Sequence, residues 1–313
     1  MHNPILQTTT LGRTGITVTR FGAGGHFTFG PSSHNDVTRR VQELNHLLDL
    51  GVNYLDVQWE PEEDATAELM KTRSDEFTVC WPIHGISQRS GDLTRDYVLQ
   101  YCQDHRKRYG FEHVDILLWV GLELQPESED KVMDELREAF LRLKSQGFCS
   151  HLAFSCHHSP QMAQHAITKY DDFDVMMVPY SYLHPAVERE LLPFARARGV
   201  GTVGMKTFGG GGGYLNMVWA GEANWGNVGA WAQSCKPYQA AIRWVMQNPN
   251  LDCVVPGMHS AQQMDELYEA IQSPYSQEDE QILSELKKAM IESDAAVQLR
   301  RDGHESHDKR SWD

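Results

Sequence analysis

The amino-acid sequence predicts an α/β fold, a single (β/α)8 barrel. Short apolar runs alternate with amphipathic helical patterns along most of the 313 residues, giving eight units of each kind. Eight such units over about 250 residues or more are typical of this barrel. Runs such as DILLWV and DVMMV show no polar alternation, as expected for parallel strands that are buried on both faces.

An open doubly wound sheet is the alternative fold for this alternation of strands and helices. That fold would place a glycine-rich fingerprint directly after the first strand. The segment Gly22-Ala23-Gly24-Gly25 is too short to match it. The pattern therefore favours the closed barrel.

The expected elements follow one another with little interruption. A hairpin at residues 5–18, turning at Gly-Arg-Thr-Gly, precedes the barrel. The apolar runs predict strands at residues 19–24, 53–56, 77–81, 114–120, 150–155, 174–178, 200–205 and 252–256. Apolar positions at helical spacing predict helices at residues 35–50, 62–73, 92–109, 127–147, 159–168, 185–199, 236–248 and 260–272. A further helix at residues 276–292 begins with Ser276-x-x-Asp279, a looser form of the capping box.

Two regions depart from this rhythm, and we expect one domain at residues 1–292 followed by a polar tail at 293–313. The segment 206–235 is a long glycine-rich loop after the seventh strand, with tryptophans at 219, 225 and 231. Loops of this length usually bind ligands, cover a site or lack order. The tryptophans indicate either a binding loop over the barrel mouth or simple anchoring of the loop to the barrel.

Charge and cysteine usage restrict the partners. The formal net charge is −15, from 28 basic and 43 acidic residues, which disfavours nucleic acid and anionic membrane surfaces. No apolar run reaches the length of a membrane span. The six cysteines show no CxxC spacing, which argues against an iron–sulfur cluster or structural zinc and favours reduced thiols in the cytoplasm. A small-molecule substrate is the expected partner, and nothing indicates an oligomeric state.

Barrel enzymes carry their active sites at the carboxyl ends of the strands. The residues expected there are Asp56, Gln58, Trp59, Trp81, His84, Trp119, Glu123, Ser155, Cys156, His157, His158, Tyr180, His184, Met205, Lys206 and His259. Ionisable groups in this set are candidate catalytic residues, namely Asp56, His84, Glu123, His157 and Lys206.

Each candidate also has a structural interpretation. Asp56 is suited to cap the helix that follows it, and His157 precedes a helix start at Ser159-Pro160. Lys206 is suited to pair with an acid without taking part in chemistry. Trp59, Trp81 and Trp119 end three consecutive strands, where they form either packing at the barrel top or one wall of an aromatic pocket.

Five segments together resemble the aldo-keto reductases in order and spacing across residues 10–270. They read LGRTGITVTRFGAGG, LLDLGVNYLD, LKSQGFCSHLAFSCHHSP, GVGTVGMKTFGGG and AIRWVMQNPNLDCVVPGMHSAQQMDEL. The SCH and GMKxFGGG motifs look most like an atypical bacterial branch. The resemblance implies a (β/α)8 barrel and NADPH-dependent reduction of aldehydes and ketones. It also implies a catalytic tetrad: a Tyr acid, a Lys and an Asp that tune it, and a His that orients the carbonyl.

Only the Asp of this tetrad has a counterpart, Asp56. The resemblance places the Tyr at Pro61, the Lys at Trp81 and the His at Val120. A nearby ammonium normally lowers the pKa of the phenol so that it can act as an acid near neutral pH. None of the three replacements can protonate an alkoxide. Ordinary NADPH-dependent reduction of simple aldehydes is therefore not expected.

The positions that the resemblance assigns to the cofactor are also altered. They fall on Ser155, Cys156, Met177, Met205, Lys206, Gln263, Glu266 and Leu267. Ser155 and Glu266 are retained, whereas Cys156 replaces an Asn and Gln263 replaces the Arg that binds the 2′-phosphate. Loss of such a charge-assisted contact costs roughly 1.5–3 kcal/mol. These changes predict a weakened NADP(H) site.

The sequence leaves three functions open. The first is an atypical aldo-keto reductase-like oxidoreductase that acts on a small carbonyl or hydroxyl compound. Here His84 or His157 would serve as acid or base. The second is a repurposed barrel enzyme, such as a lyase, epimerase or hydrolase. It could use a metal, although no linear spacing marks a metal site. The third is a non-catalytic binding or regulatory homologue. The cluster of polar residues at the mouth favours an enzyme.

Overall fold

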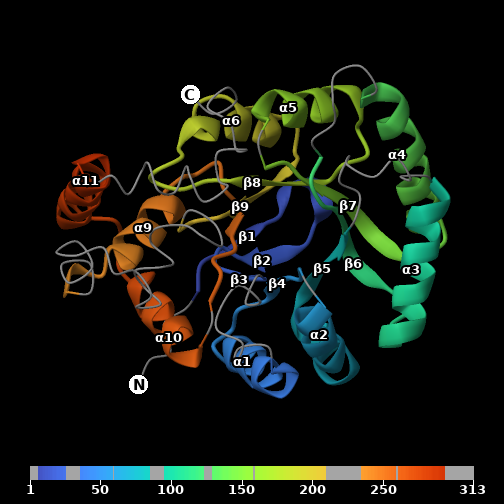
Figure 1. Ribbon diagram of the computed structural model, residues 1–313, viewed down its shortest axis with the longest axis horizontal. Coiled ribbons are helices and arrows are strands. Elements are labelled where there is room, and N and C mark those ends of the chain that lie inside the picture. Colours follow the sequence, from blue (N-terminus) through green and yellow to red (C-terminus); the bar gives the residue numbers. More distant parts are fainter. Residues whose placement is uncertain are drawn as a thin grey trace.

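The computed structural model describes residues 6–25, 36–58, 60–84, 95–122, 129–157, 159–208, 234–258 and 260–292. It confirms the barrel (Figure 1). The strands are β1 (Thr8–Thr10), β2 (Thr17–Thr19), β3 (Ala23–Gly24), β4 (Tyr54–Asp56), β5 (Thr78–Ile83), β6 (Val114–Trp119), β7 (Cys149–Ser155), β8 (Val175–Pro179), β9 (Gly201–Met205) and β10 (Cys253–Val254).

The eight strands β3 to β10 form one parallel sheet in chain order, as expected for consecutive βα units. The sheet closes on itself between its first and last strands. A bridge pairs Phe21 with Val254, and the Gly22 N–H donates to the Val254 carbonyl over 2.9 Å. The closed ring leaves these strands without a free edge.

Helices surround this ring (Figure 1). They are α1 (Val37–Asp49), α2 (Glu60–Arg73), α3 (Arg95–Tyr109), α4 (Glu129–Ser145), α5 (Pro160–Lys169), α6 (Leu191–Ala197), α9 (Pro237–Met246), α10 (Ala261–Ala270) and α11 (Gln277–Glu292). Short 3-10 turns are η1 (Gly12–Thr14), η4 (Ser74–Glu76) and η5 (Ala186–Glu188).

Helix starts follow the sequence closely. Ser276 and Asp279 form the predicted capping box: each side chain accepts a hydrogen bond from the other residue's backbone N–H. The helix expected at residues 185–199 is instead the turn η5 followed by the shorter α6. Pro193 in the first turn of α6 lacks an N–H and therefore suits a helix start.

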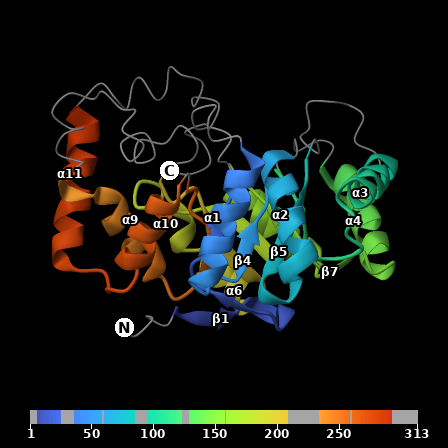
Figure 2. The same ribbon diagram turned by 90° about the horizontal axis from the view of Figure 1, so that it is seen from below.

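The N-terminal hairpin closes the end of the barrel opposite the carboxyl ends of the strands (Figure 2). Its residues Leu11 and Val18 pack into the barrel interior. Gly12 lies with φ 50° at the turn, and a Cβ there would stand 2.2 Å from the Gly201 backbone nitrogen. Only glycine permits this close approach.

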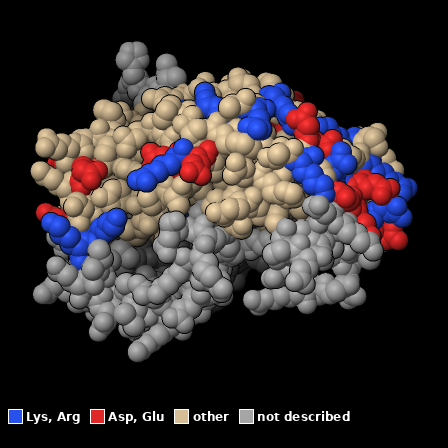
Figure 3. All heavy atoms as spheres, turned by 90° about the horizontal axis from the view of Figure 1, so that it is seen from above, with Lys and Arg blue, Asp and Glu red and all other residues tan. Residues whose placement is uncertain are grey.

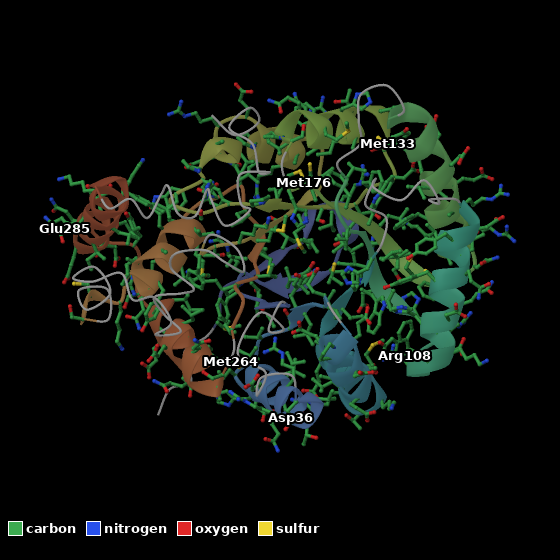
Figure 4. All side chains as sticks on the ribbon, viewed as in Figure 1. Asp36, Arg108, Met133, Met176, Met264 and Glu285 are labelled. Carbon is green, nitrogen blue, oxygen red and sulfur yellow. The ribbon has the colours of Figure 1, made fainter. Side chains whose placement is uncertain are left out.

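Side chains alternate between two apolar layers along each strand. On β6, Ile116 and Leu118 point into the barrel, whereas Leu117 and Trp119 pack with the helices. Figure 4 labels Met133, Met176 and Met264, three members of this outer layer. Because residues in register on parallel strands share a face, this alternation fixes which candidate side chains reach the barrel axis.

The surface shown in Figure 3 carries Lys and Arg side chains interspersed with Asp and Glu. No helix within the described ranges is long and apolar enough to cross a membrane. The loop residues 209–233 and the tail 293–313 lie outside the described residues, so the division into a domain and a tail stays a prediction.

Candidate functional site

Asp56 ends β4 on the inner face of the barrel and is 5% exposed. The Gln58 side-chain amide donates to Asp56 Oδ1 over 2.8 Å, and the Gly25 backbone N–H also donates to the carboxyl group. Burial raises the pKa of this carboxyl well above its ordinary value. The hydrogen bonds oppose that effect, and the neighbouring Glu62 carboxylate adds to it. Asp56 therefore holds a proton more readily than an ordinary aspartate.

Gln58 links Asp56 to His84, which follows β5. The Nε2 atom of His84 is hydrogen-bonded to the Gln58 backbone carbonyl, and the His84 carbonyl accepts a bond from the Tyr97 hydroxyl over 3.1 Å. Burial, with a smaller contribution from His105, lowers the pKa of His84 to about 4. At neutral pH His84 is uncharged, so it serves poorly as a proton donor.

Trp81 does not occupy an inner-face position, which corrects the expectation drawn from the family resemblance. Its ring contacts Tyr109 and Phe111 outside the barrel, and its Nε1–H donates to His105 Nδ1 over 3.3 Å. Trp81 pairs in register with outward-facing Leu117, so its neighbours Cys80 and Pro82 face inward. A lysine at position 81 would point at α3 rather than at Asp56.

Trp119 also faces outward, so these tryptophans do not wall a pocket at the mouth. It stacks on Phe140 of α4 at 5.8 Å between ring centroids, and it lies against Phe173. The packing interpretation holds for Trp81 and Trp119, whereas Trp59 lies outside the described residues.

The two remaining positions that the resemblance assigns to the tetrad carry side chains that cannot transfer protons. Val120 packs against the inner layer at the end of β6. Pro61 lies in the first turn of α2, where its missing N–H costs no helical hydrogen bond.

A second polar group lies at the end of β7. The Ser155 hydroxyl oxygen accepts the Gly121 backbone N–H over 3.0 Å and lies 3.2 Å from His157 Nε2. The hydroxyl has one proton and a second lone pair left for the imidazole, so the direction of this bond follows the tautomer of His157. Cys156 is fully buried in the outer layer, and its thiol donates to the Ser159 carbonyl. The Cys156 side chain thus points away from the barrel mouth, unlike the cofactor contact that the resemblance implies at this position.

Lys206 lies at the end of β9 in the left-handed region, with φ 57°. Burial and, to a smaller extent, the charge of Lys206 lower the pKa of His184. The described contacts of Asp56 do not include Lys206, so a Lys206–Asp56 pairing finds no support among them. Met205 beside it packs into the barrel interior.

Gln263 and Glu266 lie on α10. The Gln263 backbone N–H is capped by the Ser260 hydroxyl, and Glu266 accepts the Tyr238 hydroxyl over 2.8 Å. This helix, AQQMDELYEA, carries three acidic residues and neither Lys nor Arg. It therefore supplies no cation to a 2′-phosphate.

Three buried charged side chains on α1 and α2 were absent from the sequence-based set of candidates. Arg40 is 1% exposed, Glu62 is 2% exposed and Glu63 is 1% exposed. Arg40 and Glu62 form an ion pair of 2.5 Å, and Glu63 accepts the Tyr109 hydroxyl. They lie on α1 and α2. Charged residues on such helices normally face solvent, so nothing in the sequence indicated that these three side chains are buried.

Glu123, His158 and His259 lie outside the described residues, and their roles stay predictions. The part of the chain that the structure describes contains no group of three or more His, Cys, Asp or Glu side chains suited to hold a metal.

The sequence pattern of the Aldo/keto reductase family matches residues 21–216. The NADH-specific methylglyoxal reductase of Escherichia coli (strain K12) is 22% identical over 325 residues, covering 90% of this chain and 98% of that protein. The holo form of aldo-keto reductase AKR11C1 from Bacillus halodurans has a TM-score of 0.68 at 19% identity, covering 90% of this chain and 96% of that chain. Its apo form gives 0.67 over the same shares. At these identities the two structures support the fold alone.

Proposed function

Because the chain belongs to the aldo/keto reductase family, we propose that it is an oxidoreductase acting on a small carbonyl or hydroxyl compound with a nicotinamide cofactor. Asp56, and not a tyrosine, is the proton donor to the carbonyl oxygen during reduction. The single observation that carries this proposal is the neutral partner of Asp56. The Gln58 amide donates to the carboxyl, whereas the family resemblance implies a lysine as the partner of this aspartate.

With Gln58 as its partner in place of the family's lysine, the aspartate becomes the proton donor instead of a residue that tunes the donor. An ammonium group beside a buried carboxylate strongly favours the charged form, whereas a neutral amide offsets only part of the cost of burial. The pKa of Asp56 is accordingly raised, mainly by burial. A protonated carboxyl can donate to a developing alkoxide, as a raised carboxyl pKa permits in other acid catalysts. The resulting carboxylate then accepts hydrogen bonds from the Gln58 amide and the Gly25 N–H.

The described residues fit NADH better than the NADP(H) that the family resemblance implies. The acidic helix α10 opposes a 2′-phosphate, which is the group that distinguishes the two cofactors. Ser155 and the capped start of α10 are the residues proposed to hold the cofactor, which would supply the hydride when bound. The relative from Escherichia coli is NADH-specific by name. We extend that preference to this chain.

A small-molecule substrate fits the family and the acidic net charge of −15, which disfavours polyanionic partners. All six cysteines are free thiols. Free thiols support the cytoplasm, a reducing compartment, as the place where this chemistry occurs.

The proposal is tested by measuring oxidation of NADH with a panel of small aldehydes, ketones and dicarbonyls, beside the same panel with NADPH. We expect turnover of at least one carbonyl compound with NADH and loss of that turnover in Asp56→Asn. NADH that does not bind at millimolar concentration would overturn the proposal and favour a non-catalytic homologue. Metal-dependent turnover without NADH would favour a repurposed barrel enzyme.

A further inference from the structure

Arg40 is the most deeply buried charged side chain near the mouth of the barrel. Its guanidinium group donates to Glu62 Oε1 through Nε and Nη2, over 3.0 and 2.5 Å. It also donates to Glu43 over 3.3 Å and to the backbone carbonyls of Gly24 and Met258. One side chain thus joins α1 and α2 to the end of β3 and to the segment that follows β10.

Such a buried cation is costly unless its partners are fixed around it. Two of these partners are backbone carbonyls, which keep the guanidinium group in place between the two helices. The arrangement therefore holds the Glu62 carboxyl group in one position, paired with Arg40 and close to the strand ends.

Gly25 lies between this ion pair and Asp56. A Cβ at Gly25 would stand 2.5 Å from Gln58 Cγ and 2.7 Å from Glu62 Oε2, so both side chains pack against the glycine backbone. The Gly25 N–H and the Gln58 amide are the two donors to Asp56. Glu62 is consequently separated from the Asp56 donors by little more than the Gly25 backbone.

Three further titratable groups lie close enough to Asp56 for its charge to act on them. They are the Tyr54 hydroxyl on β4 and the thiols of Cys80 on β5 and Cys253 on β10. Burial raises the pKa of all three groups, so none is ionised near neutral pH. Glu62 is the charged group that raises the pKa of Asp56, after the larger effect of burial.

We infer that Glu62, held by Arg40, is a positioning residue that keeps Asp56 protonated by placing a fixed negative charge beside it. This inference rests on the proposed role of Asp56 as the proton donor. It assigns to Glu62 the electrostatic task opposite to that of the family's lysine: the fixed charge opposes ionisation of the aspartate. Arg40 supports this arrangement without touching the reacting groups.

Glu63 provides a matched control on the same helix. It is as deeply buried as Glu62, but it bonds to the Tyr109 hydroxyl and lies 3.8 Å from His105 Nδ1 on the α3 side. Glu62→Gln and Glu63→Gln make the same chemical change at neighbouring positions. Only the first removes a charge that acts on Asp56.

The test is a pH titration of the Asp56 carboxyl carbon by NMR in protein labelled with 13C-carboxyl aspartate, with the signal assigned from Asp56→Asn. We expect E62Q to lower the titration midpoint of Asp56 by about one pH unit, and E63Q to leave it unchanged. Glu62→Asp, which retains the charge, should restore most of the wild-type midpoint. Glu62→Met removes the same charge and serves if E62Q does not fold.

An unchanged Asp56 midpoint in both charge-removing variants would overturn the inference, as would equal shifts in E62Q and E63Q. These outcomes are independent of the proposed reaction. If E62Q shifts the midpoint while the wild type shows no turnover with NADH, the inference stands and the proposed function fails.

Discussion

Asp174 and Asp56 lie at opposite ends of the barrel strands, and their surroundings differ in formal charge. Asp174 precedes β8 and contacts the cations Lys144 at 3.0 Å and Arg13 at 3.3 Å, as well as His151 Nδ1 at 3.2 Å. Asp56 ends β4 and receives only neutral donors among its described hydrogen bonds. Burial alone would raise the pKa of Asp174, but hydrogen bonds from His151 and Lys144 outweigh it and lower this pKa to about 2.

This difference shows that burial alone does not decide whether the pKa of a carboxyl group is raised or lowered in this fold. Asp174 is held as a carboxylate by cations and ties the hairpin, α4 and β7 together. The pKa of Asp56 is raised by burial and by the neighbouring Glu62 carboxylate, which outweigh the hydrogen bonds from Gln58 and Gly25. The contacts of Asp174 stabilise the barrel. The surroundings of Asp56 favour its protonated form at the end of the barrel where enzymes of this fold carry out their chemistry.

The largest effect is expected from Asp56→Asn. The amide keeps the shape of the side chain but cannot donate an acidic proton, so turnover with NADH should fall by a factor of about 10²–10⁴. Because the folded-state pKa of Asp56 is raised, ionisation at this site opposes folding as pH rises above the unfolded value. The melting temperature at pH 7 should therefore be unchanged or higher. A variant that loses stability and keeps its activity would reverse the roles assigned to the two aspartates.

Asp174→Asn should have the converse effect. The folded-state pKa of about 2 lies below the unfolded value, so the carboxylate contributes stability above about pH 4 that is lost as pH falls through about 2. We expect urea unfolding at pH 7 to show a loss of about 2 kcal/mol with kcat unchanged. The difference from wild type should shrink between about pH 4 and 2. A loss that stays constant over this range would show that packing, and not charge, is responsible.

A smaller effect concerns the cofactor. Gln263→Arg places a guanidinium group on helix α10, which otherwise carries neither Lys nor Arg. Because this group can bind the 2′-phosphate, the variant should bind NADPH about tenfold more tightly, with little change for NADH. Fluorescence titration of both cofactors measures the ratio, and Gln262→Arg on the same helix is the matched control. Submicromolar binding of NADPH by the wild type would contradict the preference for NADH.

The smallest effect is expected at His84. With a pKa of about 4, it is uncharged throughout the physiological range. His84→Gln should leave the shape of the pH–rate profile between about pH 5.5 and 8 unchanged. Loss of an inflection in this range would show that His84, and not Asp56, supplies the proton.

The fold was accessible from the sequence because buried parallel strands leave uninterrupted apolar runs. The runs around Ile116 and Val175, the hairpin turn and the Ser276–Asp279 box all predicted elements that the structure contains. Helix ends were less certain, as the short α6 shows. The same absence of alternation concealed the direction of Trp81 and Trp119, since a strand buried on both faces does not reveal which residues face the barrel axis.

The position of Asp56 was also predictable, whereas its chemistry was not. Its partner Gln58 lies two residues further along, and the charge of Glu62 reaches it through the packing of α2 against Gly25. Arg40 comes from α1 and meets Glu62 only after the two helices pack together. These effects depend on tertiary contacts that no local pattern records.

The most direct measurement of the central claim is the ionisation state of Asp56 at pH 7, observed by NMR of protein labelled with 13C-carboxyl aspartate. The account predicts one resonance, absent from Asp56→Asn, that remains in the protonated form at pH 7, while the Asp174 resonance stays ionised down to about pH 2. An Asp56 resonance that titrates at or below the ordinary value, about 3.9, would contradict the account and remove Asp56 as the proton donor.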